Sequence, residues 1–405
     1  MSKFVKLSSI AELTVGFVGT MAKHYEDEGI PFLRSLNIKP FKIISDDMKY
    51  VSAEFSNSLS KSILHKGDVV IVRTGIPGTC CVVPAEYDGC NCSDVVIVHP
   101  NTELVNPHYL AAYINFWGQR QIQNNKVGAI QQHFNVHSAE EMLIFLPDIT
   151  EQEKIAKTIV ALNGKIENNF SVCVELEAMA KTLYDYWFTQ FDFPNAEGKP
   201  YRSSGGEMVW NDQLKRKIPK GWSAGQLSDI ANITMGQSPS GDTYNENGSG
   251  TIFYQGCTDF GTRFPVPRVY TSAPTRFAKA GDILMSVRAP VGTLNIAMED
   301  CCIGRGLAAL NSKFGSQLHL LYTLSGFKQL FDVMDGNGTT FGSITKDTLF
   351  EMKVVIPRRD QIKSFEEMVQ PIEQKIRVAE QENRELTKLR DWLLPMLMNG
   401  QAAVE

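Results

Sequence analysis

The pattern of apolar and polar positions along the chain predicts two long helices. One pattern runs from Ile155 to Trp187 and the other from Phe365 to Met396, and in both the apolar or small residues alternate at spacings of four and three. This alternation is close to a heptad seam. Each helix is expected to last about 38 residues, or about 57 Å at the helical rise per residue. Because one neighbouring domain could not cover such a helix, we expect the two to pack on each other as an antiparallel pair that returns the C-terminus toward the first domain.

Two residues weaken these helical patterns. Pro371 predicts either a kink in the second helix or a later start, because proline has no amide hydrogen to donate. Gly164 lowers the helix propensity of the first helix.

Each long helix follows a region of short apolar runs broken by Gly, Pro, Asn and Asp. Asp68–Val72, Val95–Val98 and Asp282–Met285 are typical of buried strands. Pro107–Gln123 and Ser316–Met334 have short helical patterns. The chain is therefore expected to form two compact α+β domains.

The two halves repeat one another about 210 to 220 residues apart. Matching residues keep their order and spacing, and the pairs include Leu7-Ser8 with Leu227-Ser228, Gly16 with Gly236, Gly67-Asp68 with Gly281-Asp282, Gly78-Thr79 with Gly292-Thr293, and Pro147 with Pro357. An ordered match of this length indicates a tandem duplication.

The expected fold class is α+β: two globular domains separated by two long antiparallel coiled-coil helices, in a pseudo-two-fold tandem repeat. The predicted segments are a first domain (1–148), a central helix (149–190), a connector (191–217), a second domain (218–357) and a C-terminal helix (358–405). The connector contains Pro, Gly and Ser at positions typical of ordered turns.

Composition limits the class of protein without identifying it. The net charge is −5, and no segment is strongly basic. A nucleic-acid partner would then require positive charge gathered on one face or supplied by other subunits. No apolar run is long enough to span a bilayer, and Met1–Ser9 lacks the apolar stretch of a signal peptide. We expect a cytoplasmic protein with no membrane partner.

Cysteine spacing favours packing over metal binding. Four of the eight cysteines fall between Cys80 and Cys92, without the paired C-x2-C spacing that usually surrounds zinc. In a reducing compartment we expect free thiols that act as small apolar strand residues.

A search for catalytic motifs finds little. The chain has no nucleotide-binding G-x4-G-K-[ST] loop, no G-x-S-x-G turn and no H-E-x-x-H helix. Glu351-Met-Lys353 and Glu197-Gly-Lys199 have the E-x-K spacing of metal-dependent nucleases, and His133 and His137 are four residues apart. We expect no catalytic and no metal site. Three classes stay open: a noncatalytic DNA-recognition subunit, a self-contained DNA-modifying or cleaving enzyme, and a structural coiled-coil adaptor.

Several motifs together resemble the specificity subunit of type I restriction-modification systems. The most specific is the central passage from Phe191-Asp-Phe-Pro194 to Ile218-Pro-Lys-Gly-Trp222, followed by Leu389-Arg-Asp-Trp-Leu-Leu394. The helix starts Glu151-Gln152 and Asp360-Gln361 belong to the same pattern. The resemblance covers nearly the whole chain.

The resemblance implies that each target-recognition domain binds one half of a bipartite double-stranded DNA target. It also implies that the helices set the spacer and dock two modification subunits, which bind S-adenosylmethionine and methylate adenine, while restriction subunits add ATP-driven translocation and cleavage. This chain would bind no cofactor directly; S-adenosylmethionine, ATP and Mg²⁺ would enter through the partners. Half-sites about one helical turn, or about 34 Å, apart would suit such a protein. Inserting one heptad into either helix should change the spacer and leave the half-site sequences unchanged.

Candidate DNA contacts lie in loops rich in groups that bind base edges or phosphates. The loop residues 126–133 and 337–343 supply Lys126, Gln131, Gln132, His133, Thr339, Thr340 and Phe341, and other loops supply Arg73, Gln237, Ser238, Tyr244, Tyr254 and Arg288. For each of them, a solvated side chain or a local turn hydrogen bond is the competing interpretation. Because the two loops differ in sequence, we expect the domains to recognise different half-sites.

Overall fold

The structure, a computed structural model, describes residues 3–118, 134–328, 331, 343–399 and 401. Its contacts divide the chain into two compact units. Unit 1 comprises Met1–Asn168 and Glu382–Glu405, and unit 2 comprises Asn169–Gln381. Each unit therefore contains one domain of mixed helices and strands together with part of each long helix.

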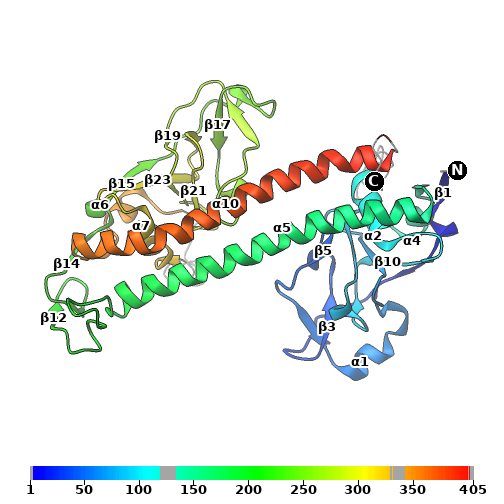
Figure 1. Ribbon diagram of the computed structural model, residues 1–405, viewed down its shortest axis with the longest axis horizontal. Coiled ribbons are helices and arrows are strands. Elements are labelled where there is room, and N and C mark those ends of the chain that lie inside the picture. The colour runs from blue at the N-terminus through cyan, green and yellow to red at the C-terminus, as the bar shows by residue number, and fades with distance from the viewer. Residues whose placement is uncertain (1–2, 119–133, 329–330, 332–342, 400, 402–405) are drawn as a thin grey trace. The chain divides into compact units, whose positions relative to one another are not determined.

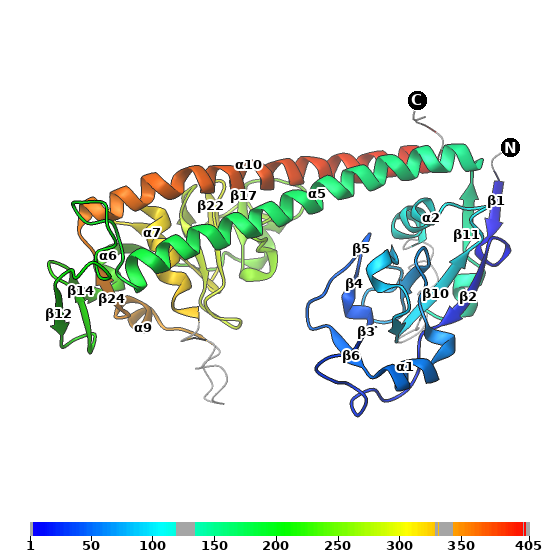
Figure 2. The same cartoon turned by 60° about the horizontal axis from the view of Figure 1, so that its bottom comes forward.

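The first domain is centred on a four-stranded antiparallel sheet (Figure 2). Its order is β2 (Ala11–Val15), β10 (Val95–Pro100), β7 (Val69–Val72) and β8 (Cys80–Val82). All four residues of β7 are buried because its alternate side chains enter different apolar clusters, with Val69 and Ile71 in one and Val70 and Val72 in the other. An unbroken apolar run, rather than an alternating one, is what a strand buried on both faces requires.

The remaining elements of the first domain surround this sheet. The other strand groups are β1 (Lys3–Lys6) with β11 (Leu143–Leu146), β6 (Lys49–Val51) with β3 (Ile30–Leu33) and β9 (Asn91–Cys92), and β4 (Ile38–Lys39) with β5 (Lys42–Ile43). The described helices are α1 (Ala53–Ser58), α2 (Pro107–Tyr113) and α4 (Val136–Glu140).

The second domain repeats this plan. Its four-stranded sheet has the order β15 (Ala231–Met235), β23 (Leu307–Ser312), β20 (Ile283–Ser286) and β21 (Leu294–Ile296). The other strands are β14 (Ser223–Gln226) with β24 (Lys353–Ile356), and a five-stranded sheet of β16 (Tyr244–Asn245), β18 (Val269–Thr271), β17 (Thr251–Tyr254), β22 (Cys301–Ile303) and β19 (Phe277–Ala278). The described helices are α6 (Leu227–Ile230), α7 (Gln317–Ser325) and α9 (Lys346–Phe350). The parallel pair β17 and β22 corresponds to β3 and β9, so the predicted duplication is confirmed in the four-stranded sheets and in this pair.

The two long helices are α5 (Ile149–Tyr184), which a π-helical turn extends over Asp185–Thr189, and α10 (Arg359–Met398) (Figure 1). In unit 1 they run antiparallel. Lys165 pairs with Glu382, whereas Asn163, which comes earlier in α5, accepts a hydrogen bond from Arg390, which comes later in α10. Leu394 enters the core of the first domain. The expected return of the C-terminus to the first domain is confirmed.

Unit 2 contains the complementary helix segments, and they are antiparallel as well. The Cys173 thiol of α5 donates to the carbonyl oxygen of Ile376 on α10 at 3.8 Å. Trp187 and Phe365 pack in one core with the second domain. α10 begins at Arg359, so the later start that Pro371 allowed is wrong. Pro371 lies on an exposed face, where water can bond the carbonyl group that lacks a helical donor.

The connector is an ordered aromatic module that packs with unit 2. Its hairpin is β12 (Met208–Asn211) with β13 (Arg216–Pro219). The Phe193 ring stacks on Tyr201 and Trp222, with centroids 4.7 and 5.1 Å apart. Asp192 accepts hydrogen bonds from the backbone and hydroxyl of Ser203, both at 2.7 Å. These ring contacts and hydrogen bonds hold the connector in one ordered conformation.

Candidate nucleic-acid interface

Two turns of the second domain meet at the end of its central sheets. One follows β15, and the other joins β22 to β23. The Gly236 amide donates to the Leu307 carbonyl at 2.9 Å, and the Gln237 amide donates to the Ile303 carbonyl at 3.0 Å. These backbone bonds place Ser238, a predicted DNA contact two residues after Gly236, beside the second turn.

The second turn, Gly304-Arg305-Gly306, depends on its glycines. A Cβ at Gly306 would lie 2.7 Å from the Gln255 carbonyl oxygen, and a Cβ at Gly236 would lie 2.1 Å from the Gly304 carbonyl oxygen. Both distances are shorter than real contacts allow. Glycine therefore lets the two turns and β17 approach closely, and the turn presents the exposed Arg305 side chain.

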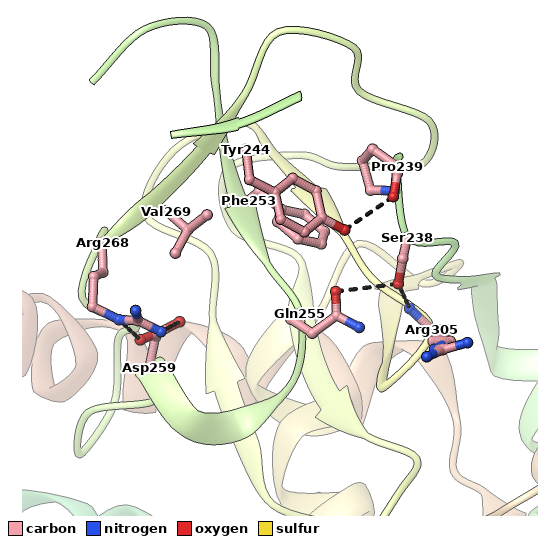
Figure 3. A pocket seen from close by; sticks show the side chains of 9 residues that line it. All are labelled: Ser238, Pro239, Tyr244, Phe253, Gln255, Asp259, Arg268, Val269 and Arg305. Atoms are coloured by element: carbon pink, nitrogen blue, oxygen red, sulfur yellow. Dashed lines mark hydrogen bonds and ion pairs between the residues drawn. The ribbon is translucent and has the colours of Figure 1, made fainter. Parts of the chain in front are cut away.

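An open pocket of about 500 Å³ lies beside these turns (Figure 3). The lining residues are Ser238, Pro239, Tyr244, Phe253, Gln255, Asp259, Arg268, Val269 and Arg305. The Ser238 hydroxyl donates to Gln255 Oε1 and accepts from the Arg305 amide, both at 3.2 Å. Ser238 thus holds Gln255 and the backbone of Arg305 in one hydrogen-bonded group.

The aromatic side of the pocket is built by Tyr244 and Phe253. Their ring centroids are 4.7 Å apart, and the Tyr244 hydroxyl donates to the Pro239 carbonyl at 3.0 Å. Tyr254, the next residue of β17, points the other way into a core cluster and is 4% exposed. Tyr254 therefore offers no surface to a nucleic acid, a correction to the sequence-based list that follows from strand alternation.

The two predicted arginines outside the pocket each contact a residue that directly follows an undescribed segment. Arg73 Nε donates to the Phe134 carbonyl at 3.2 Å. Arg288 is exposed, and its backbone forms a bridge with Ser343. Both arginines thus lie beside the residue at which the described part of the chain resumes. The predicted contacts that lie outside the described residues are Lys126, Gln131, Gln132, His133, Thr339, Thr340 and Phe341.

The first domain has a pocket at the corresponding turn. This pocket of about 380 Å³ is lined by Val15, Gly16, Phe17, Val18 and residues 58–62. The Phe17 amide donates to the Cys92 carbonyl at 2.7 Å, the counterpart of the Gln237 bond. Val18 therefore occupies the position of Ser238, and it is 73% exposed.

The lysines of the two E-x-K motifs contact a backbone carbonyl group and a neighbouring carboxylate. Lys353 donates to the Gln213 carbonyl at 3.1 Å, and Lys199 forms an exposed ion pair with Glu197 at 3.0 Å. Within the described residues, no group of three or more His, Cys, Asp or Glu side chains could hold a metal ion. Cys80, Cys81, Cys92, Cys301 and Cys302 are buried strand residues, as predicted from their spacing. Burial raises the pKa of the Cys301 thiol to about 12.

Sequence reasoning missed two residues of this site, Gln255 and Arg305. Gln255 follows β17 and looks like an ordinary polar residue at a strand end. Arg305 carried a usable signal, because an arginine between two glycines is typical of a tight turn that exposes a cation.

Comparison with known proteins identifies the kind of chain to which these turns belong. The family model for the type I restriction modification DNA specificity domain matches residues 2–176 and 219–388. A putative type I restriction enzyme MjaX specificity subunit from Methanocaldococcus jannaschii is 29% identical over 399 residues, covering 96% of this chain and 91% of the relative. The type I restriction enzyme HindI specificity subunit from Haemophilus influenzae is 23% identical over 423 residues, covering 87% and 91%.

The fold also has a counterpart among solved structures. The type I restriction-modification S subunit from M. genitalium aligns with a TM-score of 0.57 at 15% identity, covering 98% of this chain and 96% of that one. At this identity the likeness concerns the fold. Among the described residues, no helix is both long and apolar enough to cross a membrane.

Proposed function

Because the chain belongs to the type I restriction-modification DNA specificity family, we propose that its two domains each recognise one half of a bipartite DNA target. The observation that carries the proposal is the pair of matching turns. Their backbone hydrogen bonds are the same in both domains, whereas Phe17 and Val18 replace Gln237 and Ser238. A shared frame with different side chains suits two domains that bind different base sequences.

Partner subunits would supply the chemistry. Within the described part of the chain, the E-x-K pairs form no carboxylate cluster with their neighbours, and we propose that this chain is noncatalytic. S-adenosylmethionine, ATP and Mg²⁺ would act in modification and restriction subunits. A chain with a net charge of −5 also needs partners to contribute phosphate contacts, since affinity for DNA depends strongly on neutralised phosphates.

The long helices offer surfaces on which modification subunits can dock. In unit 1, Trp392 of α10 is 58% exposed and Leu389, one helical turn before it, is also exposed. In unit 2, Met179 of α5 and Val378 of α10 are exposed. Large apolar side chains on helix faces are typical of protein interfaces. The helix lengths would then also set the spacer between half-sites.

Co-expression with a type I modification subunit tests this function. The expected result is co-purification of the two proteins and methylated adenine within one bipartite DNA motif. The control is the modification subunit alone, which should methylate no such motif. A complex that methylates without sequence preference, or a purified chain that cleaves or methylates DNA by itself, would contradict the proposal.

A further inference from the structure

The two arginines of the second-domain pocket differ in what already holds them. Arg268 pairs with Asp259 at 2.8 Å and with Glu246 at 3.2 Å. Arg305 is exposed, and the described residues give its guanidinium no ion-pair partner. Among the residues that line the pocket, the charge of Arg268 offsets that of Asp259, so the lining keeps the positive charge of Arg305. A guanidinium fork of this kind binds a phosphate, a carboxylate or the edge of a guanine.

The neighbours of Arg305 favour a base edge over a phosphate. Its amide is held by the Ser238 hydroxyl (Figure 3), and the flanking glycines fix a tight turn, so the exposed side chain is the part of Arg305 that can bind a ligand. Gln255 lies on the other side of Ser238. Base edges are recognised by side chains held in a defined place, whereas phosphate contacts come from many kinds of donor and carry no sequence information.

The hydrogen-bonding pattern selects among the bases. Ser238 donates to Gln255 Oε1 and so occupies one of the two acceptor sites of that oxygen, whereas none of the described groups accepts a hydrogen bond from the Gln255 Nε2 hydrogens. The edge of the pocket therefore presents donors from both Gln255 and Arg305. Guanine has two acceptors, O6 and N7, on its major-groove edge, whereas adenine needs a donor and an acceptor, and cytosine needs an acceptor. From this we infer that Arg305 recognises a guanine, through O6 and N7, in the half-site bound by the second domain.

This inference rests on the proposed function and is tested with the full chain in complex with its modification subunits. Duplexes carrying the mapped target are made with each guanine replaced singly by 7-deazaguanine, which lacks the N7 acceptor. Replacement of one guanine, in one half-site, should weaken DNA binding by the complex with the original protein sequence about fivefold or more at constant salt. Arg305→Ala should remove that sensitivity. The protein without this substitution should prefer guanine over adenine at that position roughly 5- to 150-fold, and Arg305→Ala should reduce the preference to about onefold.

The controls separate the possible failures. Lys217→Ala removes one exposed positive charge from β13 and should leave the base preference intact. Arg305→Gln gives a second variant if the alanine variant does not fold. A complex with no bipartite target would refute the proposed function. A bipartite target at which no guanine is sensitive to 7-deaza replacement would overturn only the role of Arg305, as would an equal loss of affinity for every sequence in Arg305→Ala, which indicates a phosphate contact.

Discussion

The two domains share a backbone frame and differ in the chemistry it carries. The turn after β2 presents Phe17 and Val18, and the turn after β15 presents Gln237 and Ser238, although equivalent amides donate to equivalent carbonyls. An apolar pair suits contact with a thymine methyl group, while a polar pair suits hydrogen bonds. The comparison shows that side chains at this turn can change without disturbing the fold.

The second turn differs even more. The first domain has Ser93 and Asp94 between β9 and β10, where the second has Gly304-Arg305-Gly306. Asp94 accepts a hydrogen bond from the Thr74 hydroxyl and takes a positive φ of 58°. An acid thus stands in one copy where an arginine stands in the other, and a surface of opposite charge should prefer a different base edge.

The domains also differ in how charge attaches them to the helices. In unit 2, Arg263 is 4% exposed and lies 3.6 Å from both Glu373 of α10 and Glu177 of α5. In unit 1, the ion pair of Lys42 with Glu167 is at the surface. Buried and exposed ion pairs have very different energetics, so this contrast gives the largest expected effect.

Arg263→Ala should lower the free energy of unfolding by about 3–5 kcal/mol, because it leaves the Glu373 carboxylate buried without its ion-pair partner. Lys42→Ala should cost less than about 1 kcal/mol. Urea unfolding of both variants measures the difference. The double change Arg263→Met with Glu373→Met should recover most of the loss. Equal effects of Arg263→Ala and Lys42→Ala would refute the contrast.

The glutamines at the helix starts give a smaller difference of the same kind. Gln152 is fully buried; it accepts from the Asn106 amide at 2.9 Å and donates to two carbonyls. Gln361 accepts one bond, from Trp222 Nε1 at 2.8 Å. Gln152→Ala should therefore cost about 2–3 kcal/mol and Gln361→Ala about 1 kcal/mol, since each leaves buried groups unpaired. Urea unfolding again measures both, and a larger loss at Gln361 would contradict the comparison.

Exchanging the second turn tests whether the frame and its chemistry are separable. Replacing Ser93 and Asp94 by Gly-Arg-Gly should give the first half-site a preference for guanine at one position, of about fivefold or more, and leave the second half-site unchanged. Methylation mapping of the co-expressed complex measures both. Gly-Ala-Gly at the same place is the control for loop length. A change in the second half-site would show that the domains do not recognise DNA independently.

The overall plan of the fold was predictable because its signals are local. Apolar runs predicted β7, β10 and β20, and the heptad-like spacing predicted α5 and α10. The repeated Gly-Asp and Gly-Thr pairs then aligned the domains. These features depend on neighbours a few residues away, which a sequence displays directly.

The site was less predictable because it depends on contacts between distant segments. Ser238 and Tyr244 were found from their loop, but the grouping of Ser238 with Arg305 arises from a hydrogen bond that spans 67 positions. Tyr254 was misjudged, because which face of β17 is buried depends on the partner strand. The burial of Arg263 between two helices likewise has no local signal.

The smallest predicted effect concerns pH. His99 Nδ1 lies 2.8 Å from Asp68 Oδ1, and in the second domain Asn311 donates to Asp282 at 2.9 Å in the equivalent place. The hydrogen bond to Asp68 raises the pKa of His99 above its usual 6.5. Its extra stabilisation is then fully present below the unfolded-state pKa of about 6.5 and is lost as pH rises through the higher folded-state pKa.

The first domain should therefore lose up to about 1 kcal/mol between mildly acidic and mildly alkaline pH, while the second loses none from this position. Amide hydrogen exchange of β7 and of β20 measures the two domains separately in one sample. His99→Asn should remove the dependence from the first domain, and Asn311→His should introduce it into the second. If Asn311→His leaves β20 insensitive to pH, the two positions are not equivalent, and the correspondence of the two frames does not extend to this strand end.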